Sequence, residues 1–295
     1  MKILALDFDG VIVDSVLDSL FIGHNAYLRL YGHGKKKYFG GELFTFESWE
    51  ETKKQHQEEI KYYRTLRPYI RGATDYGLIQ RLIEENKFVK NQEEFDNYRM
   101  VVEFDFEAYE KEFYKERERL QNINYRAWFN LEPSYPKVIE GMKKLLEERT
   151  KIVIATSNKR EAIAKSFTPE FFGFTIKPED ILDMRFGEYK SEQMKHIVKL
   201  YNVKFEEIYF VDDQLNHLIQ TRLLGVKVLL AGWSYATEAQ KEEARKQNIL
   251  LIEKEEDFYP IVKNFLKNTV LGGGSLLKIK NRKGEKDENS RLQRS

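Results

Sequence analysis

The chain has 295 residues, of which 41% are apolar and 33% charged, with a formal net charge of +1 and no cysteine. This balance argues against a surface dedicated to nucleic acid, and the lack of cysteine excludes disulfides and thiolate metal sites. No apolar run approaches the ~20 residues of a membrane span, and no secretory signal is visible, so we expect a cytoplasmic enzyme without a membrane or nucleic-acid partner.

The first element is an apolar strand, Ile3-Leu4-Ala5-Leu6, that runs directly into Asp7-Phe8-Asp9-Gly10. Strand alternation places Asp7 and Asp9 on the same side of the backbone. Two like charges so close raise each other's pKa. A divalent cation removes this conflict, and so does a division of labour between a nucleophile and an acid/base. Both interpretations indicate chemistry at the carboxyl end of a strand, where open α/β sheets place their sites.

Residues 16–132 differ from the first strand because they are aromatic, highly charged and helical in pattern. Amphipathic periodicity predicts helices at 16–31, 47–65, 76–85, 93–100 and 106–120. No convincing alternation typical of strands occurs there. We therefore expect an all-helical domain inserted after the first strand.

From residue 133 onward the pattern alternates between helix and strand. Helices are expected at 137–148, 160–167, 191–201, 215–224, 237–247 and 257–266. Strands are expected at 151–155, 208–211, 226–230 and 249–252. Such alternation predicts a doubly wound, mostly parallel α/β sheet covered on both faces. The core would comprise residues 1–15 and 133–270, split by the insertion at 16–132.

The last segment, residues 271–295, has a different composition. It begins with a Gly-rich sequence typical of a flexible linker, and it holds seven Lys/Arg and three Asp/Glu, a net of +4. We interpret it as a flexible basic tail. A contact of this tail with RNA or anionic lipid is the alternative to a merely solvated segment.

Polar residues that suit phosphoryl transfer stand at four places in the core. These are Asp7 with Asp9, the run Thr156-Ser157-Asn158 after a strand, Lys190 at the start of a helix with Ser191 as its expected N-cap, and Asp212-Asp213 after another strand. A carboxylate nucleophile needs a nearby cation, and a second carboxyl must protonate the leaving oxygen. A hydroxyl and an ammonium would hold the phosphoryl oxygens. The distal acids complete an all-oxygen site that suits Mg²⁺.

This set of motifs resembles the haloacid dehalogenase-like (HAD) superfamily, in the branch similar to phosphoglycolate phosphatase and β-phosphoglucomutase. The opening Asp-x-Asp-Gly-Val-x-Val-Asp-Ser matches the first motif of that family very closely. The resemblance covers the core, about residues 1–15 and 133–268. It implies a Rossmann-like core, and the helical insertion is similar to the family's C1 cap.

The resemblance also implies a role for each motif residue. Asp7 would attack phosphorus and become an aspartyl-phosphate, while Asp9 would protonate the leaving group and then activate water. Mg²⁺ would be held by Asp7, the backbone carbonyl of Asp9 and Asp213, with Asp212 as a further ligand or supporting acid. The phosphoryl group would be bound by Thr156 or Ser157 with Asn158, and Lys190 would neutralise it.

Two departures from the family pattern leave alternatives open. The second motif aligns in two ways, one favouring Thr156 and the other Ser157 as the phosphate-binding hydroxyl. The family often has a further acid after the fourth motif, where this chain has Asn216 and His217. A neutral histidine is a poor Mg²⁺ ligand beside carboxylates, so we assign the second acidic role to Asp212 and interpret His217 as a helix-surface residue.

The substrate is expected to be a small phosphorylated metabolite, because a cap that closes over the site excludes bulk water and large substrates. Arg67 and Arg71, in an Arg-Pro-x-x-Arg-Gly sequence, could reach a substrate anion; the alternative is a pair of solvent-facing arginines. Asp9 supplies the proton-donating carboxyl that phosphatases and phosphomutases of this superfamily have two residues after the nucleophile. The resemblance therefore implies Mg²⁺-dependent hydrolysis of a phosphate monoester. A β-phosphoglucomutase-type phosphomutase and a non-catalytic binding protein are the alternatives. The protein would be a monomer or a homodimer.

Overall fold

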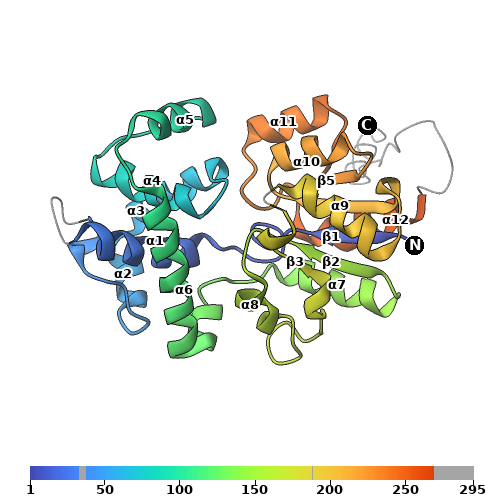
Figure 1. Cartoon of the computed structure of the whole chain (residues 1–295), viewed down its shortest axis with the longest axis horizontal. Helices are drawn as coiled ribbons and strands as arrows, with labels where there is room; N and C mark the ends of the chain where they lie inside the picture. The colour runs from blue at the N-terminus through green and yellow to red at the C-terminus, as the bar shows by residue number, and fades with distance from the viewer. Residues whose placement is uncertain (33–37, 188, 269–295) are drawn as a thin grey trace, which may run out of the picture.

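The computed structural model of the chain describes residues 1–32, 38–187 and 189–268. Figure 1 shows two parts, a sheet flanked by helices and a group of helices beyond the ends of its strands. The tail expected at 271–295 lies outside the described residues. No helix in the described ranges combines the length and the apolar character needed to cross a membrane.

Six parallel strands in the described chain form one sheet in the order β3-β2-β1-β4-β5-β6. They are β1 (Ile3–Leu6), β2 (Lys151–Ala155), β3 (Ile181–Leu182), β4 (Ile208–Asp212), β5 (Lys227–Ala231) and β6 (Leu250–Ile252). Strand β1 lies at the centre, where Ile3 pairs with Lys151 of β2 and Ile208 of β4. It runs from the N-terminus toward the second group of helices, so the carboxyl ends of the strands face that group (Figure 1).

Helices cover both faces of the sheet. They are α7 (Pro136–Glu147), α8 (Arg160–Ile163), α9 (Lys190–Tyr201), α10 (Leu215–Arg222), α11 (Glu238–Lys246) and α12 (Phe258–Asn268). Leu4 and Leu6 of β1 belong to the apolar cluster of α7 and α12, whereas Ile3 and Ala5 belong to that of α9, α10 and α11. Burial of every β1 side chain is typical of a parallel strand between two helical layers. The predicted doubly wound α/β fold is confirmed.

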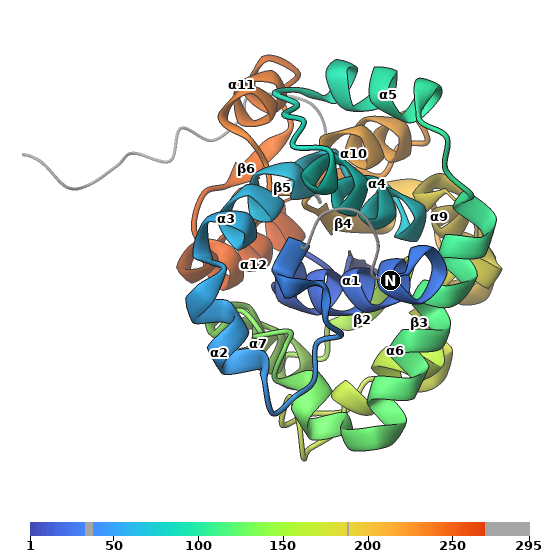
Figure 2. The ribbon, with the colours of Figure 1, turned by 90° about the vertical axis from the view of Figure 1, so that its left-hand side faces the viewer.

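The second group of helices, which we call the cap, follows β1 in the sequence. It consists of α1 (Val16–Tyr31), α2 (Trp49–Gln55), α3 (Gln57–Leu66), α4 (Ala73–Glu84), α5 (Gln92–Val101) and α6 (Phe106–Phe129). Figure 2 looks onto this group, with α1 and α4 in the middle and α6 along one side. Large aromatic side chains form its core, among them Tyr63, Tyr109, Phe113 and Trp128, each at most 1% exposed. This burial agrees with the aromatic composition of the insertion.

Two antiparallel segments connect the cap to the core. The Asp14 N–H donates to the Pro133 carbonyl at 2.9 Å, and the Tyr135 N–H donates to the Ile12 carbonyl at 2.9 Å. The chain therefore leaves the core at residues 12–14 and re-enters it at residues 133–135, side by side and a few residues beyond the end of β1.

Some expected elements differ from those observed. The helix expected at 47–65 is divided at His56, whose φ and ψ of −120° and 39° are not helical. The helix expected at 106–120 continues to Phe129, across a kink at Asn124. Helix α9 begins at Lys190 with Tyr189 as its N-cap, so the expectation that Ser191 caps it was wrong. Strand β3 was not predicted, because two residues are too few to establish an alternating pattern.

Candidate active site

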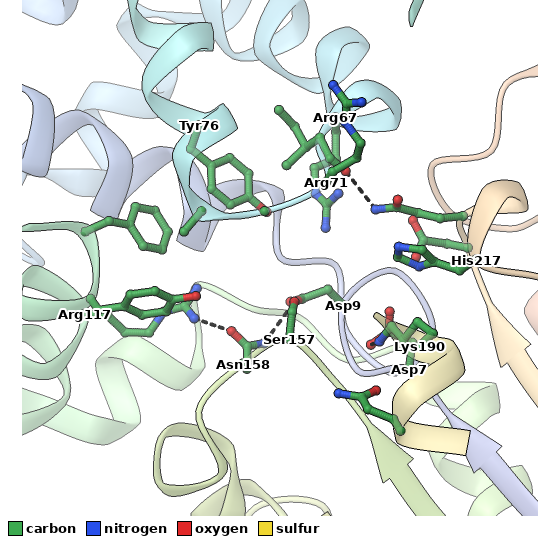
Figure 3. Close-up of a pocket in the computed structure, with 18 residues that line it drawn as sticks. Asp7, Asp9, Arg67, Arg71, Tyr76, Arg117, Ser157, Asn158, Lys190 and His217 are labelled. Atoms are coloured by element: carbon green, nitrogen blue, oxygen red, sulfur yellow. Dashed lines mark hydrogen bonds and ion pairs between the residues drawn. The ribbon is translucent and has the colours of Figure 1, made fainter. Parts of the chain in front are cut away.

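A pocket lies between the carboxyl ends of the strands and the cap, with a free volume of about 680 Å³ including its open mouth. The core side contributes Asp7, Asp9, Ser157, Asn158, Lys190, Gln193, Asp213, Gln214 and His217. The cap side contributes Arg67, Ile70, Arg71, Gly72, Ala73, Tyr76, Phe113, Tyr114 and Arg117. Figure 3 shows these side chains converging from segments that are far apart in the sequence.

Asp7 and Lys190 form a buried ion pair on the floor of the pocket. Asp7 follows β1, and its Oδ1 lies 2.9 Å from Lys190 Nζ and accepts the Phe8 N–H at 2.7 Å. Lys190, the first residue of α9, also donates to the Ala155 carbonyl at 2.5 Å. Burial raises the pKa of Asp7 to about 6, although Lys190 opposes the shift. Burial lowers the pKa of Lys190, but the nearby carboxylates outweigh that effect and raise it, so the side chain stays cationic.

Asp9 lies beyond the end of β1, in a turn that depends on Gly10. Its Oδ2 accepts a hydrogen bond from Asn158 Nδ2 at 2.9 Å, while its buried Oδ1 has no partner among the described residues. Gly10 has a φ of +72°, and a Cβ there would lie 2.6 Å from Asp213 Cγ. Only glycine adopts this conformation readily, so the turn that places Asp9 also leaves room for the Asp213 carboxylate.

The segment after β2 separates the two candidate hydroxyls. Thr156 is fully buried, does not line the pocket, and its Oγ1 accepts the Asn158 N–H at 3.0 Å. Ser157 is exposed and lines the pocket. Asn158 is buried and lies between Asp9 and the cap (Figure 3). The geometry therefore favours Ser157 over Thr156 as a hydroxyl that a ligand can reach.

Asp212, the last residue of β4, and Asp213, which follows it, have different surroundings. Asp212 is fully buried; its Oδ1 accepts the Gln214 N–H at 2.8 Å and its Oδ2 lies 3.0 Å from His217 Nδ1. Burial would raise the pKa of Asp212, but His217 and Lys190 outweigh burial and lower it. Burial and the Asp212 charge hold the pKa of Asp213 well above its usual range. His217, on α10, is partly exposed, and its side chain also lines the pocket.

The acids fit a divalent cation. Asp7, Asp212 and His217 each offer a ligand atom, and these atoms lie within 4.8 Å of one another. Asp213 is a third buried carboxylate at the same edge of the sheet. Buried carboxylates in excess of nearby cations are unfavourable without a counter-ion, and clustered carboxylate oxygens are the donors that Mg²⁺ prefers.

Arg67 and Arg71 both reach the pocket but differ in exposure and in partners. Arg67 is buried, in the turn between α3 and α4. Arg71 is exposed and its guanidinium pairs with Asp96. Arg71 therefore faces solvent and Arg67 does not, while both side chains line the pocket.

A sequence model of the haloacid dehalogenase-like hydrolase family matches residues 1–220. This chain belongs to that family. The matched region contains the cap, the Asp7 and Asp9 loop, Lys190 and the acids after β4, so every core residue of the pocket lies within it.

Solved structures share the HAD-like hydrolase fold along almost their whole length. One, from Lactobacillus delbrueckii subsp. bulgaricus, is described as a putative phosphoglycolate phosphatase; it is 15% identical with a TM-score of 0.56, over 89% of this chain and 99% of that one. Another, from Haemophilus somnus, is described as a predicted phosphoglycolate phosphatase; it is 13% identical with a TM-score of 0.54, over 89% and 98%. No curated protein matches the chain. At these identities the likeness concerns the fold alone.

Among the pocket residues of this HAD-like hydrolase that sequence reasoning did not single out is Arg117 of α6. Arg117 is buried, hydrogen-bonds the Asn158 Oδ1, and donates to Asp18 Oδ2 at 2.9 Å. It lies within the charged run Lys115-Glu116-Arg117-Glu118-Arg119, where no single charge is distinguished. Its helical spacing from Phe113 and Leu120, on the buried face of α6, was the available signal.

Proposed function

We propose that this HAD-like hydrolase is a Mg²⁺-dependent phosphatase that hydrolyses a small phosphate monoester through an aspartyl-phosphate on Asp7. The observation that carries the proposal is the buried Asp7–Lys190 pair, which lies in one pocket with Asp9 and Ser157. A carboxylate held beside an ammonium is suited to attack an anionic phosphoryl group, because the cation offsets the repulsion between them.

In the first half of the proposed reaction, a carboxylate oxygen of Asp7 bonds to phosphorus while the bond from phosphorus to the alcohol oxygen breaks. Asp9 donates a proton to that leaving oxygen. In the second half, Asp9 takes a proton from water, the water oxygen attacks phosphorus, and the Asp7 carboxylate leaves. Inorganic phosphate and the free alcohol are the products, and both aspartates return to their starting states.

The phosphoryl oxygens would be held by Ser157, Asn158 and Lys190. Ser157 supports this role because it is exposed to the pocket, whereas the Thr156 hydroxyl is buried and engaged with the Asn158 backbone. The Asn158 amide has two hydrogens, and one of them bonds Asp9. The second is free for a phosphoryl oxygen.

Asp7, Asp212 and Asp213 would hold Mg²⁺, together with the backbone carbonyl of Asp9. When bound, Mg²⁺ supplies positive charge that offsets the combined negative charge of the phosphoryl group and the aspartates. His217 is assigned to orienting Asp212, since its Nδ1 lies 3.0 Å from that carboxylate and oxygen donors suit Mg²⁺ better than imidazole.

The size and position of the pocket support a small substrate. The cap, proposed to span residues 16–132, forms the roof, and the Gln214 side chain donates to the Ile70 carbonyl across the gap at 2.8 Å. A phosphoprotein would not fit easily under this roof. Two solved structures of the same fold are described as predicted or putative phosphoglycolate phosphatases, which agrees with a small phosphorylated metabolite.

Hydrolysis of p-nitrophenyl phosphate, with Mg²⁺ and with EDTA, tests the proposal. We expect turnover that requires Mg²⁺ in the wild type and is abolished in Asp7→Asn, because an amide cannot form the aspartyl-phosphate. A matched control is Asp257→Asn, an exposed acid that does not line the pocket, which should retain wild-type turnover. Near-wild-type activity of Asp7→Asn would contradict the mechanism.

A further inference from the structure

A buried arginine on the cap side of the pocket has unused hydrogen-bond donors. Arg67 is only 3% exposed, and its Nε and Nη1 atoms are buried without a hydrogen-bond partner among the described residues. Burying a guanidinium is unfavourable unless its N–H groups find acceptors. Arg67 therefore has the properties of a group whose partner is supplied by a ligand.

Aromatic rings hold Arg67 in place without engaging its donors. The guanidinium carbon lies 4.4 Å from the centre of the Tyr235 ring and 5.7 Å from that of Tyr76. A cation–π contact draws on the charge of the cation and leaves its N–H groups free. The planar fork of a guanidinium can then bind a carboxylate or a phosphate through two parallel hydrogen bonds.

The other two arginines that line the pocket are engaged by the protein itself. The Arg71 guanidinium pairs with Asp96 on the cap surface, and Arg117 hydrogen-bonds Asn158 and Asp18. Among the described pocket arginines, Arg67 has two buried guanidinium nitrogens without a hydrogen-bond partner, whereas Arg117 has one, its Nε, and bonds Asn158 and Asp18 through the other two.

Arg67 also lies apart from the phosphoryl-binding residues proposed above. Lys190 and Ser157 belong to the core, whereas Arg67 comes from the cap and lies on the opposite side of the pocket, above Asp9 (Figure 3). Asp213 and Asp9 are near enough to favour the charged form of Arg67. Neither of these carboxylates, however, accepts a hydrogen bond from its Nε or Nη1.

We propose that Arg67 is a second anion site and that the substrate is a phosphate monoester whose alcohol portion carries a further anionic group, a carboxylate or a second phosphate. This inference rests on the proposed phosphatase function and adds the substrate class to it. The reacting phosphoryl group is held by the core and the second anion by the cap. Such a substrate connects the two parts, so its binding energy also favours the closed arrangement that excludes water.

Matched substrate pairs test this inference. One pair is a short phosphorylated hydroxy acid and its amide, and the other is a short diol bisphosphate and the corresponding monophosphate. We expect the wild-type kcat/KM to be ~10- to 100-fold higher for the member with the second anion, which corresponds to one charge-assisted bidentate contact. The pair with the larger ratio identifies the second group as carboxylate or phosphate.

Variants of Arg67 assign the selectivity to this residue. Arg67→Met keeps much of the side-chain volume and removes the charge, so the ratio within each pair should fall to about 1. Arg67→Lys keeps the charge but loses the bidentate fork, and should retain an intermediate ratio. Arg81→Met removes an arginine of the neighbouring helix α4 that pairs with Glu84 and Glu85 on the surface, and should keep the wild-type ratio.

Two results would overturn the inference while leaving the phosphatase proposal intact. They are equal wild-type kcat/KM values within both pairs, and a loss in Arg67→Met that is the same for both members of a pair. The second result would assign Arg67 to balancing the charges of Asp213 and Asp9. If Arg67→Met fails to fold, the ratio measured for Arg67→Lys decides the matter.

A binding measurement separates this inference from the phosphatase proposal. A short phosphonocarboxylate has no bond that a phosphatase can cleave, so calorimetry of its binding does not depend on turnover. We expect it to bind the wild type ~10-fold or more tightly than its amide, and Arg67→Met to lose the difference. Absence of p-nitrophenyl phosphate hydrolysis would contradict the phosphatase proposal alone, whereas equal binding of acid and amide would contradict the second anion site.

Discussion

Asp9 is oriented by a chain of side chains that begins in the cap. Its only hydrogen bond from a described side chain comes from Asn158, whose own Oδ1 accepts from Arg117 (Figure 3). Arg117 is held in turn by Asp18, whose other oxygen accepts the Trp128 Nε1–H at 2.6 Å. All members of this chain beyond Asp9 are buried. The direction in which Asp9 points therefore depends on cap residues that form no hydrogen bond with Asp9 itself.

The acid role proposed for Asp9 predicts a dependence on the leaving group. An alkoxide must be protonated as it leaves, whereas p-nitrophenolate is stable as an anion and leaves without a proton. In Asp9→Asn, kcat/KM should fall by ~10²–10⁴-fold for alkyl phosphates and far less for p-nitrophenyl phosphate. Since kcat/KM covers only the steps up to the first irreversible one, slow hydrolysis of the aspartyl-phosphate does not obscure the comparison. An equal fall in kcat/KM for both substrates would contradict the acid role of Asp9.

Arg117 should show the same pattern in a weaker form, because it acts on Asp9 through Asn158. For Arg117→Met we expect an alkyl phosphate kcat/KM reduced by about 10-fold, with a smaller change for p-nitrophenyl phosphate. The matched control is Arg119→Met, which removes a half-exposed arginine two positions away on α6. If Arg117 had only a structural role, Arg117→Met would lower kcat/KM for both substrates by the same factor and would also lower the melting temperature.

The segments that join the cap to the core contain a buried acid. Glu132 lies between the end of α6 and Pro133, is 1% exposed, and neither of its carboxylate oxygens accepts a hydrogen bond from a described residue. Burial raises the pKa of Glu132 well above its usual range, and the neighbouring Asp18 charge adds to the shift. Burial and the Asp18 charge thus favour the neutral form of this carboxyl in the folded protein.

Glu132→Gln should stabilise the protein increasingly as the pH rises. Below the ordinary glutamate pKa of ~4.3, Glu132 is protonated whether the chain is folded or not, so the substitution has no electrostatic effect. Above it, the unfolded state ionises and the folded state does so only at a higher pH, which destabilises the wild type by about 1.4 kcal/mol per unit of raised pKa. Thermal melts of the two proteins should coincide near pH 4 and separate toward pH 8.

The control for this element is Glu147→Gln, which replaces an exposed glutamate at the end of α7. It should leave the melting temperature unchanged at either pH. A wild type more stable than Glu132→Gln at pH 8 would mean that an ionised Glu132 has a favourable partner.

The elements that could be predicted from the sequence are those with a long or strongly polar signal. Apolar runs bounded by polar residues indicated β1, β2 and β4, and the acids and hydroxyls that follow them indicated where the pocket lies. The break at His56 has no glycine or proline to mark it. The contacts that Arg117 and His217 make in the pocket could not be predicted, because they join different elements, with Asn158 and Asp212 respectively. Local patterns carry no information on such contacts.

At the scale of the whole molecule, the core supplies the carboxylates of the pocket, and the cap supplies most of the positively charged side chains that line it. Asp7 directly follows β1, Asp212 ends the neighbouring strand β4 and Asp213 follows it. The fold itself therefore concentrates negative charge at the carboxyl ends of two central strands. Lys190 is the only described lysine in the pocket, and its ammonium pairs with Asp7. The folded protein should therefore bind a divalent cation that the unfolded chain does not.

Mg²⁺ should accordingly raise the melting temperature of the wild type. A ligand at 100 times its dissociation constant stabilises a protein by about 2.7 kcal/mol, which corresponds to ~5–10 °C for a chain of this size. Melts in EDTA and in excess Mg²⁺ measure the shift, with KCl at matched ionic strength as the control.

Asp213→Asn should act in opposite directions on the melting temperature in EDTA and on the gain from Mg²⁺. Removing a buried acid beside Asp212 raises the melting temperature in EDTA, and removing a proposed Mg²⁺ ligand reduces the gain from Mg²⁺. Asp257→Asn, at an exposed acid, should change neither value. A wild type that melts at the same temperature with and without Mg²⁺ would show that the acids at these strand ends are balanced by the protein alone.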